Sequence, residues 1–387
     1  MKIRAITYGM PTPDRDDIAP WHKARVLLAA ATARFQEGGV EVQTQRIALS
    51  PTPFRGADQK FAIVEHARWA ERRCLEAGAG YISIGPVGYD TDLDVASAAL
   101  AEAISTTELV FGSMRTTQNG KVMDAACGAA AAVVASLAKS TPGGFGNLRF
   151  AALASCPPGI PFFPAAYHGH PYPTMGLALE AADLLEAATK NGSPRGQLPG
   201  TLAGAVEAAL LPVQRAALAI QEEHDVAYLG ADLSPAPFPL PGVSIGAAME
   251  QVSGAPFGAA GTLAACAMVT RALRLARVRT CGFSGFMLPV LEDSILAKRA
   301  SEGRFNLSQL LLFSSVCGTG LDTVPIPGDT TVGQLVAVIR DMSALSASLR
   351  KPLTARLFPI PGKAAGEEVT YEFPYFAAGA AVLPVNA

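Results

Sequence analysis

The sequence predicts an α/β fold built as one domain. Strand-like runs alternate with helix-like stretches of roughly 12 to 20 residues, which is typical of right-handed crossovers between parallel strands. Half of the 387 residues are hydrophobic and only 17% are charged, so a large apolar core is expected. No low-complexity linker or internal repeat divides the sequence. These observations favour about nine or ten buried strands in a single domain, residues 1–387.

The first third of the chain alternates regularly between strands and helices. Apolar residues recur with a helical period over Asp17–Gln36, and two glycines follow as a stop signal. The expected strands are Ile3–Tyr8, Val40–Leu49, Tyr81–Ile84, Leu109–Phe111 and Phe150–Ser155. The expected helices are Asp17–Gln36, Asp58–Glu76, Leu93–Ile104 and Met123–Leu137.

The rest of the chain is less regular because Pro-rich loops interrupt it. One such loop, Cys156–Tyr172, holds five prolines and two histidines. The helices expected after it are Thr174–Lys190, Gly204–Glu223, Ser244–Val252, Thr262–Ala276, Asp293–Glu302 and Val332–Leu349. The expected strands are Val226–Ala231, Thr354–Phe358 and Val369–Phe373, with strand-loop segments at Thr280–Leu288 and Leu312–Val316.

The charge and cysteine patterns narrow the class of protein. The 31 basic and 33 acidic residues give a net charge of -2, and hence no electrostatic reason to bind nucleic acid or an anionic membrane. The most apolar run, Ala125–Ala138, is shorter than the roughly 20 residues that a membrane span needs. The first residues contain no signal-peptide core, and the six cysteines are scattered without a CxxC pair. We therefore expect a cytoplasmic protein with reduced thiols.

Titratable residues stand in Gly- and Pro-rich loops where we expect the carboxyl ends of strands, the usual place of function in parallel α/β folds. His168, beside Gly169, is a candidate general base or metal ligand; the alternative is a loop histidine that bonds to carbonyl groups. Asp232 directly follows an apolar strand and is a candidate acid or base, with Ser234 beside it. The alternative for Asp232 is a turn or capping role.

Two further glycine-rich loops are candidate substrate contacts. Gly282, Ser284 and Gly285 lie in the run GFSGF, whose spacing differs from that of a serine-hydrolase elbow and fits a backbone anion cradle better. Cys317 precedes Gly318 and is a candidate nucleophile; the alternative is a buried small hydrophobe.

Carboxylates are also candidates for a metal site or for helix caps. Asp322 is a candidate substrate contact, and with Glu292 and Asp232 it could form an oxygen-rich cluster suited to a divalent cation. Asp293 and Asp329 stand where helix caps are expected. The spacings match no metal, nucleotide or NAD motif, so no cofactor is assigned.

These loops, in their order, resemble an uncharacterised bacterial and archaeal family, number 0210 among uncharacterised protein families (domain of unknown function 711). The similar stretches are PFFPAAYHG, GADLSPAPFP, GVSIGAAMEQV, GTLAAC, CGFSGFMLPVLEDS, FSSVCGTGLDTVPIPGDT and AAVLPVN. The resemblance implies a ten-stranded α/β barrel like that of pyruvate formate-lyase, with Cys317 on an inner loop. The glycyl-radical motif of those enzymes is missing around Gly379, so non-radical chemistry is expected.

The leading hypothesis is a non-radical lyase or transferase that acts on a small polar or anionic metabolite inside the barrel. His168 and Asp232 would transfer protons and Cys317 would act as nucleophile. The substrate contacts would be Gly169, Ser234, Gly282, Ser284, Gly285, Gly318 and Asp322. The alternatives are a divalent-metal-dependent hydrolase using Asp232, Glu292, Asp322 and His168, and a metabolite-binding regulator without turnover. A homo-oligomer, most simply a dimer, is also expected.

Overall fold

One large mixed sheet forms the centre of the molecule in the computed structural model, which describes residues 1–51, 54, 58–88, 91–190 and 197–385. Nine strands are hydrogen-bonded in the order β10-β11-β7-β4-β3-β2-β1-β8-β9. They are β1 (Lys2–Met10), β2 (Gln45–Leu49), β3 (Tyr81–Val87), β4 (Val110–Arg115), β7 (Phe150–Ala154), β8 (Thr174–Glu180), β9 (Ala227–Ala236), β10 (Gly320–Pro327) and β11 (Leu353–Ile360). β1, β2, β3, β4 and β7 run parallel, whereas β8 and β11 are antiparallel to their neighbours β1 and β7. The expected α/β class is confirmed.

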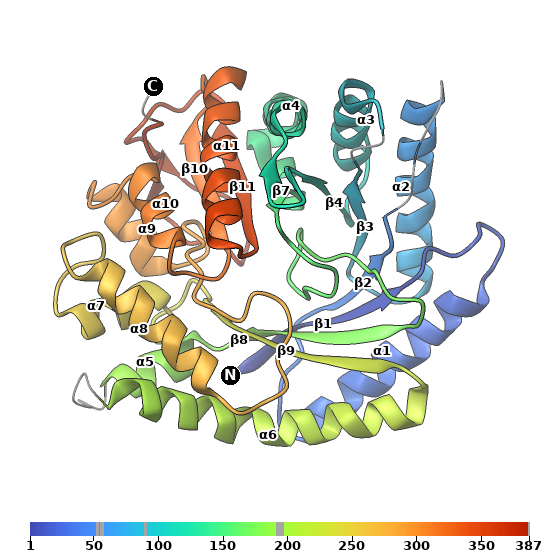
Figure 1. Ribbon diagram of the computed structural model, residues 1–387, viewed down its shortest axis with the longest axis horizontal. Coiled ribbons are helices and arrows are strands. Elements are labelled where there is room, and N and C mark those ends of the chain that lie inside the picture. Colours follow the sequence, from blue (N-terminus) through green and yellow to red (C-terminus); the bar gives the residue numbers. More distant parts are fainter. Residues whose placement is uncertain (52–53, 55–57, 89–90, 191–196, 386–387) are drawn as a thin grey trace.

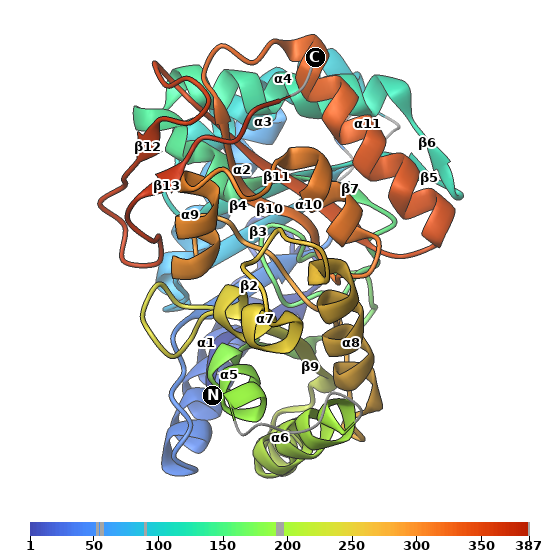
Figure 2. The same cartoon turned by 90° about the vertical axis from the view of Figure 1, so that its left-hand side faces the viewer.

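Helices surround the sheet (Figure 1). α2, α3, α4 and α11 lie along one side of the molecule, and α1 and α6 lie along the opposite side. α5 and α7 to α10 close the flank that faces the viewer in Figure 2. The helices are α1 (Ala19–Glu37), α2 (Gln59–Glu76), α3 (Leu93–Ser105), α4 (Asp124–Ser140), η1 (Pro142–Arg149), α5 (Ala182–Lys190), α6 (Leu198–His224), α7 (Ile245–Ser253), α8 (Thr262–Leu275), α9 (Ser294–Ser301), α10 (Leu307–Ser314) and α11 (Val332–Leu349). Because both faces of the sheet are covered, strands such as β8 and β11 are buried at every residue.

The sheet is open, so the expectation of a closed ten-stranded barrel is not met by the described residues. The two end strands, β9 and β10, do not pair with each other. Segment 279–291 runs between them and makes one parallel bridge to each, Ala231↔Thr280 and Pro289↔Asp322. Gly282 and Ser284 have positive φ values of 66° and 41°, which an extended strand cannot adopt. The segment therefore connects the two ends of the sheet as a loop.

Some expected elements are wrong because strands buried on both faces lack alternation. Thr174–Lys190 was expected as one helix, but its first part is β8 and only the second part is α5. β8 is rich in helix-forming residues and is held as a strand by β1 and β9. No strand was expected between Val316 and the helix that begins at Val332, but β10 lies there. Its prolines Pro325 and Pro327 are tolerated because β10 ends the sheet.

Three smaller expectations at helix and strand ends also differ from the structure. Leu312–Val316 is not a strand, because α10 begins at a capping box formed by Asn306 and Gln309 and runs to Ser314. The N-cap of α11 is Thr331 rather than Asp329, whereas Asp293 caps α9 as expected. In Val369–Phe373 only the first residue is extended, in β12 (Glu368–Val369), which pairs with β13 (Ala380–Ala381). The other short pair is β5 (Thr117–Gln118) with β6 (Lys121–Val122).

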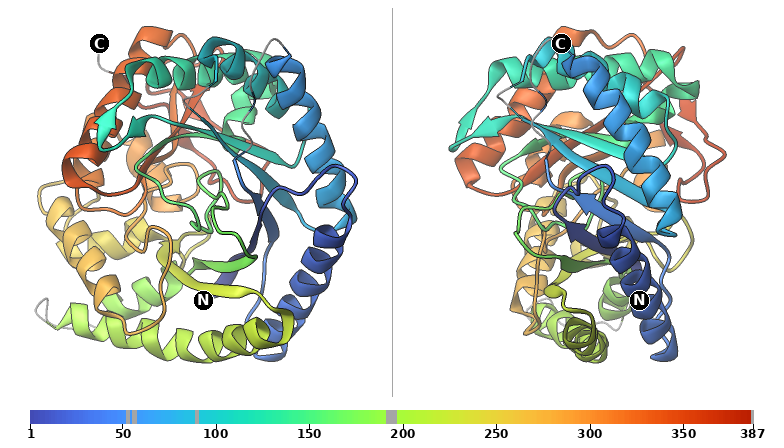
Figure 3. Two further views of the ribbon diagram at one scale, coloured as in Figure 1. Left: turned by 45° about the vertical axis from the view of Figure 1, so that its right-hand side comes forward. Right: turned by 90° about the vertical axis from the view of Figure 1, so that its right-hand side faces the viewer.

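The Pro-rich loop 156–172 lies inside the ring of strands and helices (green in the left view of Figure 3). Thr7 of β1 donates a hydrogen bond to Pro161 O at 2.8 Å, and Ser83 of β3 donates one to Ala166 O at 2.6 Å. Phe163 and Ala166 pack with Ala48 and Phe111 in a small apolar cluster separate from the main core. The loop therefore covers the inner face of the curved sheet.

Among the described residues, one helix is long and apolar enough to cross a bilayer by length and composition. That helix is α6, and a third of its most apolar window is buried. It packs against α1, α5 and α8 on the outside of the molecule.

Candidate functional site

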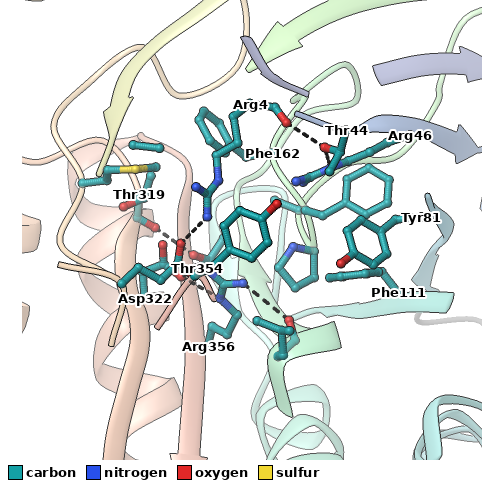
Figure 4. A pocket seen from close by; sticks show the side chains of 18 of the residues that line it. Arg4, Thr44, Arg46, Tyr81, Phe111, Phe162, Thr319, Asp322, Thr354 and Arg356 are labelled. Carbon is teal, nitrogen blue, oxygen red and sulfur yellow. Dashed lines mark hydrogen bonds and ion pairs between the residues drawn. The ribbon is translucent and has the colours of Figure 1, made fainter. Parts of the chain in front are cut away.

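A pocket opens at the amino ends of the central strands (Figure 4). Arg4, Arg46, Tyr81 and Phe111 reach it from within the first three residues of β1, β2, β3 and β4. The other side is formed by β10, β11 and segments 162–165, 283–292 and 373–375. Its volume of about 80 Å³ is several times the roughly 10–15 Å³ that one water molecule requires. The pocket can therefore hold a small metabolite.

A network of buried ion pairs joins the two sides of this pocket. Arg356 of β11 lies 2.6 Å from Asp322 and 2.9 Å from Glu292. Arg4 of β1 lies 2.5 Å from the other oxygen of Glu292 and 3.6 Å from Glu180. Glu292 therefore has an arginine on each carboxylate oxygen. Such pairs are stable under burial because each charge has a partner and hydrogen bonds.

Arg46 is not part of these ion pairs. It is buried, and among the described residues no carboxylate forms an ion pair with it. Its Nε donates to Thr44 Oγ1 at 2.9 Å, and its guanidinium carbon lies 5.5 Å and 5.2 Å from the ring centroids of Tyr81 and Phe163. Burial, together with the nearby Arg4 charge, lowers the pKa of Arg46 to about 10, so the side chain is a cation at neutral pH. The Arg46 side of the pocket is therefore electropositive.

Asp322 is the carboxylate best placed for proton transfer. Arg356 Nε donates to its Oδ1 at 2.7 Å, and no hydrogen bond to Oδ2 occurs among the described residues. Burial raises the pKa of Asp322 above its ordinary value, and the nearby Arg356 charge opposes that rise. The free oxygen and the raised pKa together are properties of a general acid or base.

Two other polar side chains of the pocket have unused hydrogen-bonding capacity. Thr319 Oγ1 is buried and has no partner among the described residues. Gln43 donates to Glu180, while its Oε1 is likewise buried without a partner in that part of the chain. Buried polar atoms are normally satisfied, so a bound ligand or water is the expected partner of both.

The sequence-predicted residue Asp232 lies elsewhere, in the middle of β9, and is fully buried. Its Oδ1 accepts hydrogen bonds from Ser234 N, Ser234 Oγ and Ser284 N at 3.0, 2.7 and 2.8 Å, and its Oδ2 accepts one from Phe283 N at 2.7 Å. Burial raises its pKa, and these donors oppose the rise. A Cβ on Gly282 would lie 2.1 Å from Asp232 Oδ2. The structure thus brings Asp232, Ser234, Gly282 and Ser284 together, and their hydrogen bonds hold segment 279–291 against β9. The predicted acid–base role of Asp232 stays a prediction.

His168 lies at the opposite ends of the strands. Its backbone N–H donates to Leu49 O, at the carboxyl end of β2, and its side chain is buried. Nε2 lies 2.7 Å from His170 O, and Nδ1 lies 3.3 Å from Thr174 Oγ1, so both ring nitrogens are engaged. Burial lowers the pKa of His168 to about 4. Gly169 packs against Pro158 beside it. A catalytic role for His168 stays a prediction.

Cys317 and its glycine neighbours form a packing contact. Cys317 is fully buried, and its Sγ accepts a hydrogen bond from Gly320 N at 3.4 Å. A Cβ on Gly285 would lie 2.7 Å from the Cα of Gly318, so the two backbones touch. Lys351 Nζ donates to the carbonyl oxygens of Ser314 and Cys317, which fixes the same turn. The predicted role of Cys317 as nucleophile stays a prediction.

The residues of the metal-hydrolase hypothesis lie in three separate places. Glu292 and Asp322 share Arg356, Asp232 is surrounded by N–H and O–H donors, and His168 contacts Thr174. No group of three or more His, Cys, Asp or Glu side chains suited to a metal ion occurs within the described ranges.

A comparison with protein families shows to which family the chain belongs. The family model described as "Uncharacterised ACR (DUF711)" matches residues 1–372. The chain belongs to the DUF711 family. The resemblance noted in the loops is thus confirmed, and it extends into the amino-terminal third, which contributes Arg4 and Arg46 to the pocket.

Members of the same family occur in archaea and bacteria. A UPF0210 protein of Pyrobaculum arsenaticum is 32% identical over 366 residues, covering 89% of this chain and 79% of that protein. One of Pyrobaculum islandicum is 33% identical over 347 residues, covering 85% and 76%. One of Limosilactobacillus reuteri is 27% identical over 381 residues, covering 94% and 84%. The names of these relatives state no biochemical activity.

The arginines of this DUF711 pocket were missed by the sequence analysis, although a signal for them exists. Arg4, Arg46 and Arg356 each stand alone in an apolar strand, in the runs IRAIT, QRIAL and TARLF. Charged residues are rare in strands that are buried on both faces, because an unpaired charge there is costly. Three such arginines in one protein predict a common polar cavity.

Proposed function

We propose that the pocket binds a small anionic metabolite and that the protein is a non-radical enzyme acting on it. The observation that carries the proposal is Arg46, a buried cation that faces the pocket and lacks a carboxylate partner among the described residues. A carboxylate or phosphate group of a ligand would supply that partner through charge-assisted hydrogen bonds. Arg4 and Arg356 are already paired and would mainly position Glu292 and Asp322.

The chemistry that this pocket favours is proton transfer. Asp322 has an oxygen without a hydrogen bond within the described ranges, and burial raises its pKa above the ordinary value. It would take a proton from the bound metabolite or return one, while Arg356 limits the cost of its charge. A lyase or transferase reaction with such a step is the reaction type of the proposal.

A barrel-like enclosure is part of the proposal. Segment 279–291 hydrogen-bonds to β9 through Ala231 and to β10 through Asp322, so it spans the two ends of the open sheet. Phe283, Met287 and Glu292, on or just after this segment, line the pocket. This arrangement supports a likeness to the pyruvate formate-lyase fold, in which strands enclose the site.

The test combines ligand binding with product analysis. Acetate, pyruvate, benzoate and inorganic phosphate are titrated into the protein by calorimetry, and each binder is then incubated and analysed by mass spectrometry. We expect at least one to bind, Arg46→Gln to weaken it by at least about tenfold, and Arg271→Gln, an exposed control on α8, to have no effect. Equal binding by Arg46→Gln and wild type would refute the proposal.

The proposed catalytic role of Asp322 is tested separately with the variant Asp322→Asn. A bound metabolite that is converted by the wild type and remains unconverted by Asp322→Asn supports an acid–base role for Asp322. A metabolite that is bound and never converted favours the alternative of a binding protein without turnover.

Assembly into a dimer remains part of the proposal. Phe61 and Leu75 of α2 are 70% and 62% exposed and provide apolar surface that a second copy would cover. Light scattering coupled to gel filtration tests this, and a monomeric mass at micromolar concentration would contradict it.

A further inference from the structure

Aromatic side chains are concentrated in the Arg46 pocket. Seven of its 21 lining residues are Phe or Tyr, whereas aromatic residues make up 7% of the whole chain. Tyr81, Phe111 and Phe163 form one group, with ring centroids 5.1 Å apart in edge-to-face contacts. Phe373 and Tyr375 form a second group, with centroids 5.3 Å apart, on segment 373–375. The ligand space is therefore bordered by rings that come from two separate parts of the fold.

The rings near Arg46 restrict how it can meet an anion. Its guanidinium lies over the rings of Tyr81 and Phe163, and Thr44 occupies Nε. Within the described residues the two Nη groups make no hydrogen bond, so the planar edge that carries them remains for the ligand. A carboxylate matches that edge with two parallel hydrogen bonds in one plane. Arg46 thus favours a carboxylate, which can accept both hydrogen bonds from that edge.

The far side of the pocket has a different chemistry. Thr319, Asp322 and Arg356 lie on the side opposite Arg46 and Tyr81 (Figure 4). Arg356 is already paired with both Asp322 and Glu292, so a second anion there would meet two carboxylates. The Thr319 hydroxyl, unpartnered within the described residues, can instead bond to a neutral hydroxyl or carbonyl group.

From these three features we propose that the pocket takes a flat aromatic or conjugated monocarboxylate with a neutral hydrogen-bonding group at its far end. The inference rests on the proposed anion site and names the class of its ligand. The carboxylate pairs with Arg46, the flat body lies among the aromatic rings, and the far group bonds to Thr319.

A set of matched probes tests each part of the inference by calorimetry. The probes are 4-hydroxybenzoate, benzoate, trans-4-hydroxycyclohexanecarboxylate and terephthalate, with acetate and inorganic phosphate as small anions. We expect 4-hydroxybenzoate to bind at least about tenfold more tightly than its saturated analogue, because ring stacking is lost. We expect terephthalate to bind at least about tenfold more weakly than 4-hydroxybenzoate, because its second carboxylate faces Asp322 and Glu292.

One variant tests the contact at the neutral end of the ligand, and a second variant is its control. Thr319→Val should weaken 4-hydroxybenzoate about fivefold and leave benzoate unchanged. Thr270→Val is the matched control, because Thr270 is also buried with no partner for its hydroxyl in the described part of the chain, but lies on α8 outside the pocket.

The outcomes distinguish this inference from the proposed function. Equal affinity for the flat and saturated acids, with both lost in Arg46→Gln, would overturn the aromatic ligand class and keep the anion site. Tight terephthalate binding would overturn the neutral far end. Binding of all six probes that is unchanged in Arg46→Gln, or no binding of any probe, would overturn both proposals.

Discussion

Two buried aspartates, Asp232 and Asp322, show how differently one side chain is used in this fold. Both lie in strands of the same sheet, and burial raises the pKa of both. Asp232 accepts four hydrogen bonds from Ser234, Phe283 and Ser284, and so its oxygens serve the protein itself. Asp322 is bound on one oxygen by Arg356 and borders the pocket.

The two aspartates differ in how many hydrogen bonds the protein donates to their carboxylate oxygens. A carboxylate oxygen that receives none from the protein can bind a ligand instead. A carboxylate has about four acceptor positions. Asp232 accepts three hydrogen bonds on Oδ1 and one on Oδ2 from groups of its own chain, whereas Asp322 keeps one oxygen without a hydrogen bond among the described residues. The largest effects on stability should therefore arise at Asp232, and the largest effects on ligands at the Arg46 pocket.

Asp232→Asn should give the largest loss of stability. The amide removes the charge and places N–H donors against the donors of Phe283 or Ser284, so buried groups lose their partner. We expect the free energy of unfolding to fall by roughly 3 kcal/mol. Urea denaturation measures it, with Asp329→Asn, at an exposed position, as the control. A loss below about 1 kcal/mol would remove the distinction between the two aspartates.

Arg46→Gln should separate binding from stability. The lost charge-assisted contact costs about 2 kcal/mol of binding free energy, or roughly 30-fold in affinity for a carboxylate ligand. The free energy of unfolding should change by less than about 1 kcal/mol. Removal of a buried cation that has no carboxylate partner among the described residues offsets the lost ring contacts. Calorimetry and urea denaturation on one preparation measure both. A large stability loss without an affinity loss would assign Arg46 a structural role.

The sequence predicts the framework of this molecule better than its pocket. Helices with clear apolar periodicity, such as Val332–Leu349, have the expected bounds. The strands of the first third occur where expected, but β2 begins five residues later and β3 and β4 end three and four residues later than expected. The strand β8 was not predicted, because its pairing with β1 and β9 overrides its helix-forming composition. Periodicity reports which face of one element is buried, and it contains no information on pairing between distant strands.

The pocket could be predicted only in part. Asp322 and Glu292 were singled out, and the structure brings both to Arg356. Arg4, the second arginine partner of Glu292, is 288 residues from it in the chain, so only the sheet order reveals the contact. Function was expected at the carboxyl ends of the strands, whereas this pocket lies at the amino ends of β1 to β4. That expectation assumes parallel strands alone, and here two antiparallel pairs bring other strand ends to the same side.

Gly285→Ala tests the close contact between segment 279–291 and the loop before β10. The new Cβ would lie 2.7 Å from Gly318 Cα, so segment 279–291 must move away from the loop before β10. We expect a loss of roughly 1.5 kcal/mol in the free energy of unfolding. Gly204→Ala in α6 is the control, because no atom of the described residues lies within 4 Å of its new Cβ, and it should stabilise by up to about 1 kcal/mol. Equal behaviour of the two variants would contradict the close contact of the backbones.

The smallest expected effect concerns the pH dependence contributed by His168. Burial lowers its folded-state pKa to about 4, below the ordinary value of 6.5. Between these values the unfolded chain binds a proton that the folded chain does not, so stability falls as the pH decreases from 6.5 toward 4. His168→Gln should reduce this slope and keep a donor for His170 O, whereas His22→Gln, at an exposed position, should not change it. Part of the slope should remain, because burial also lowers the pKa of His66 to about 4. An unchanged slope in His168→Gln, measured by urea denaturation at pH 7 and pH 5, would show that His168 titrates alike in both states and is open to solvent or to a ligand.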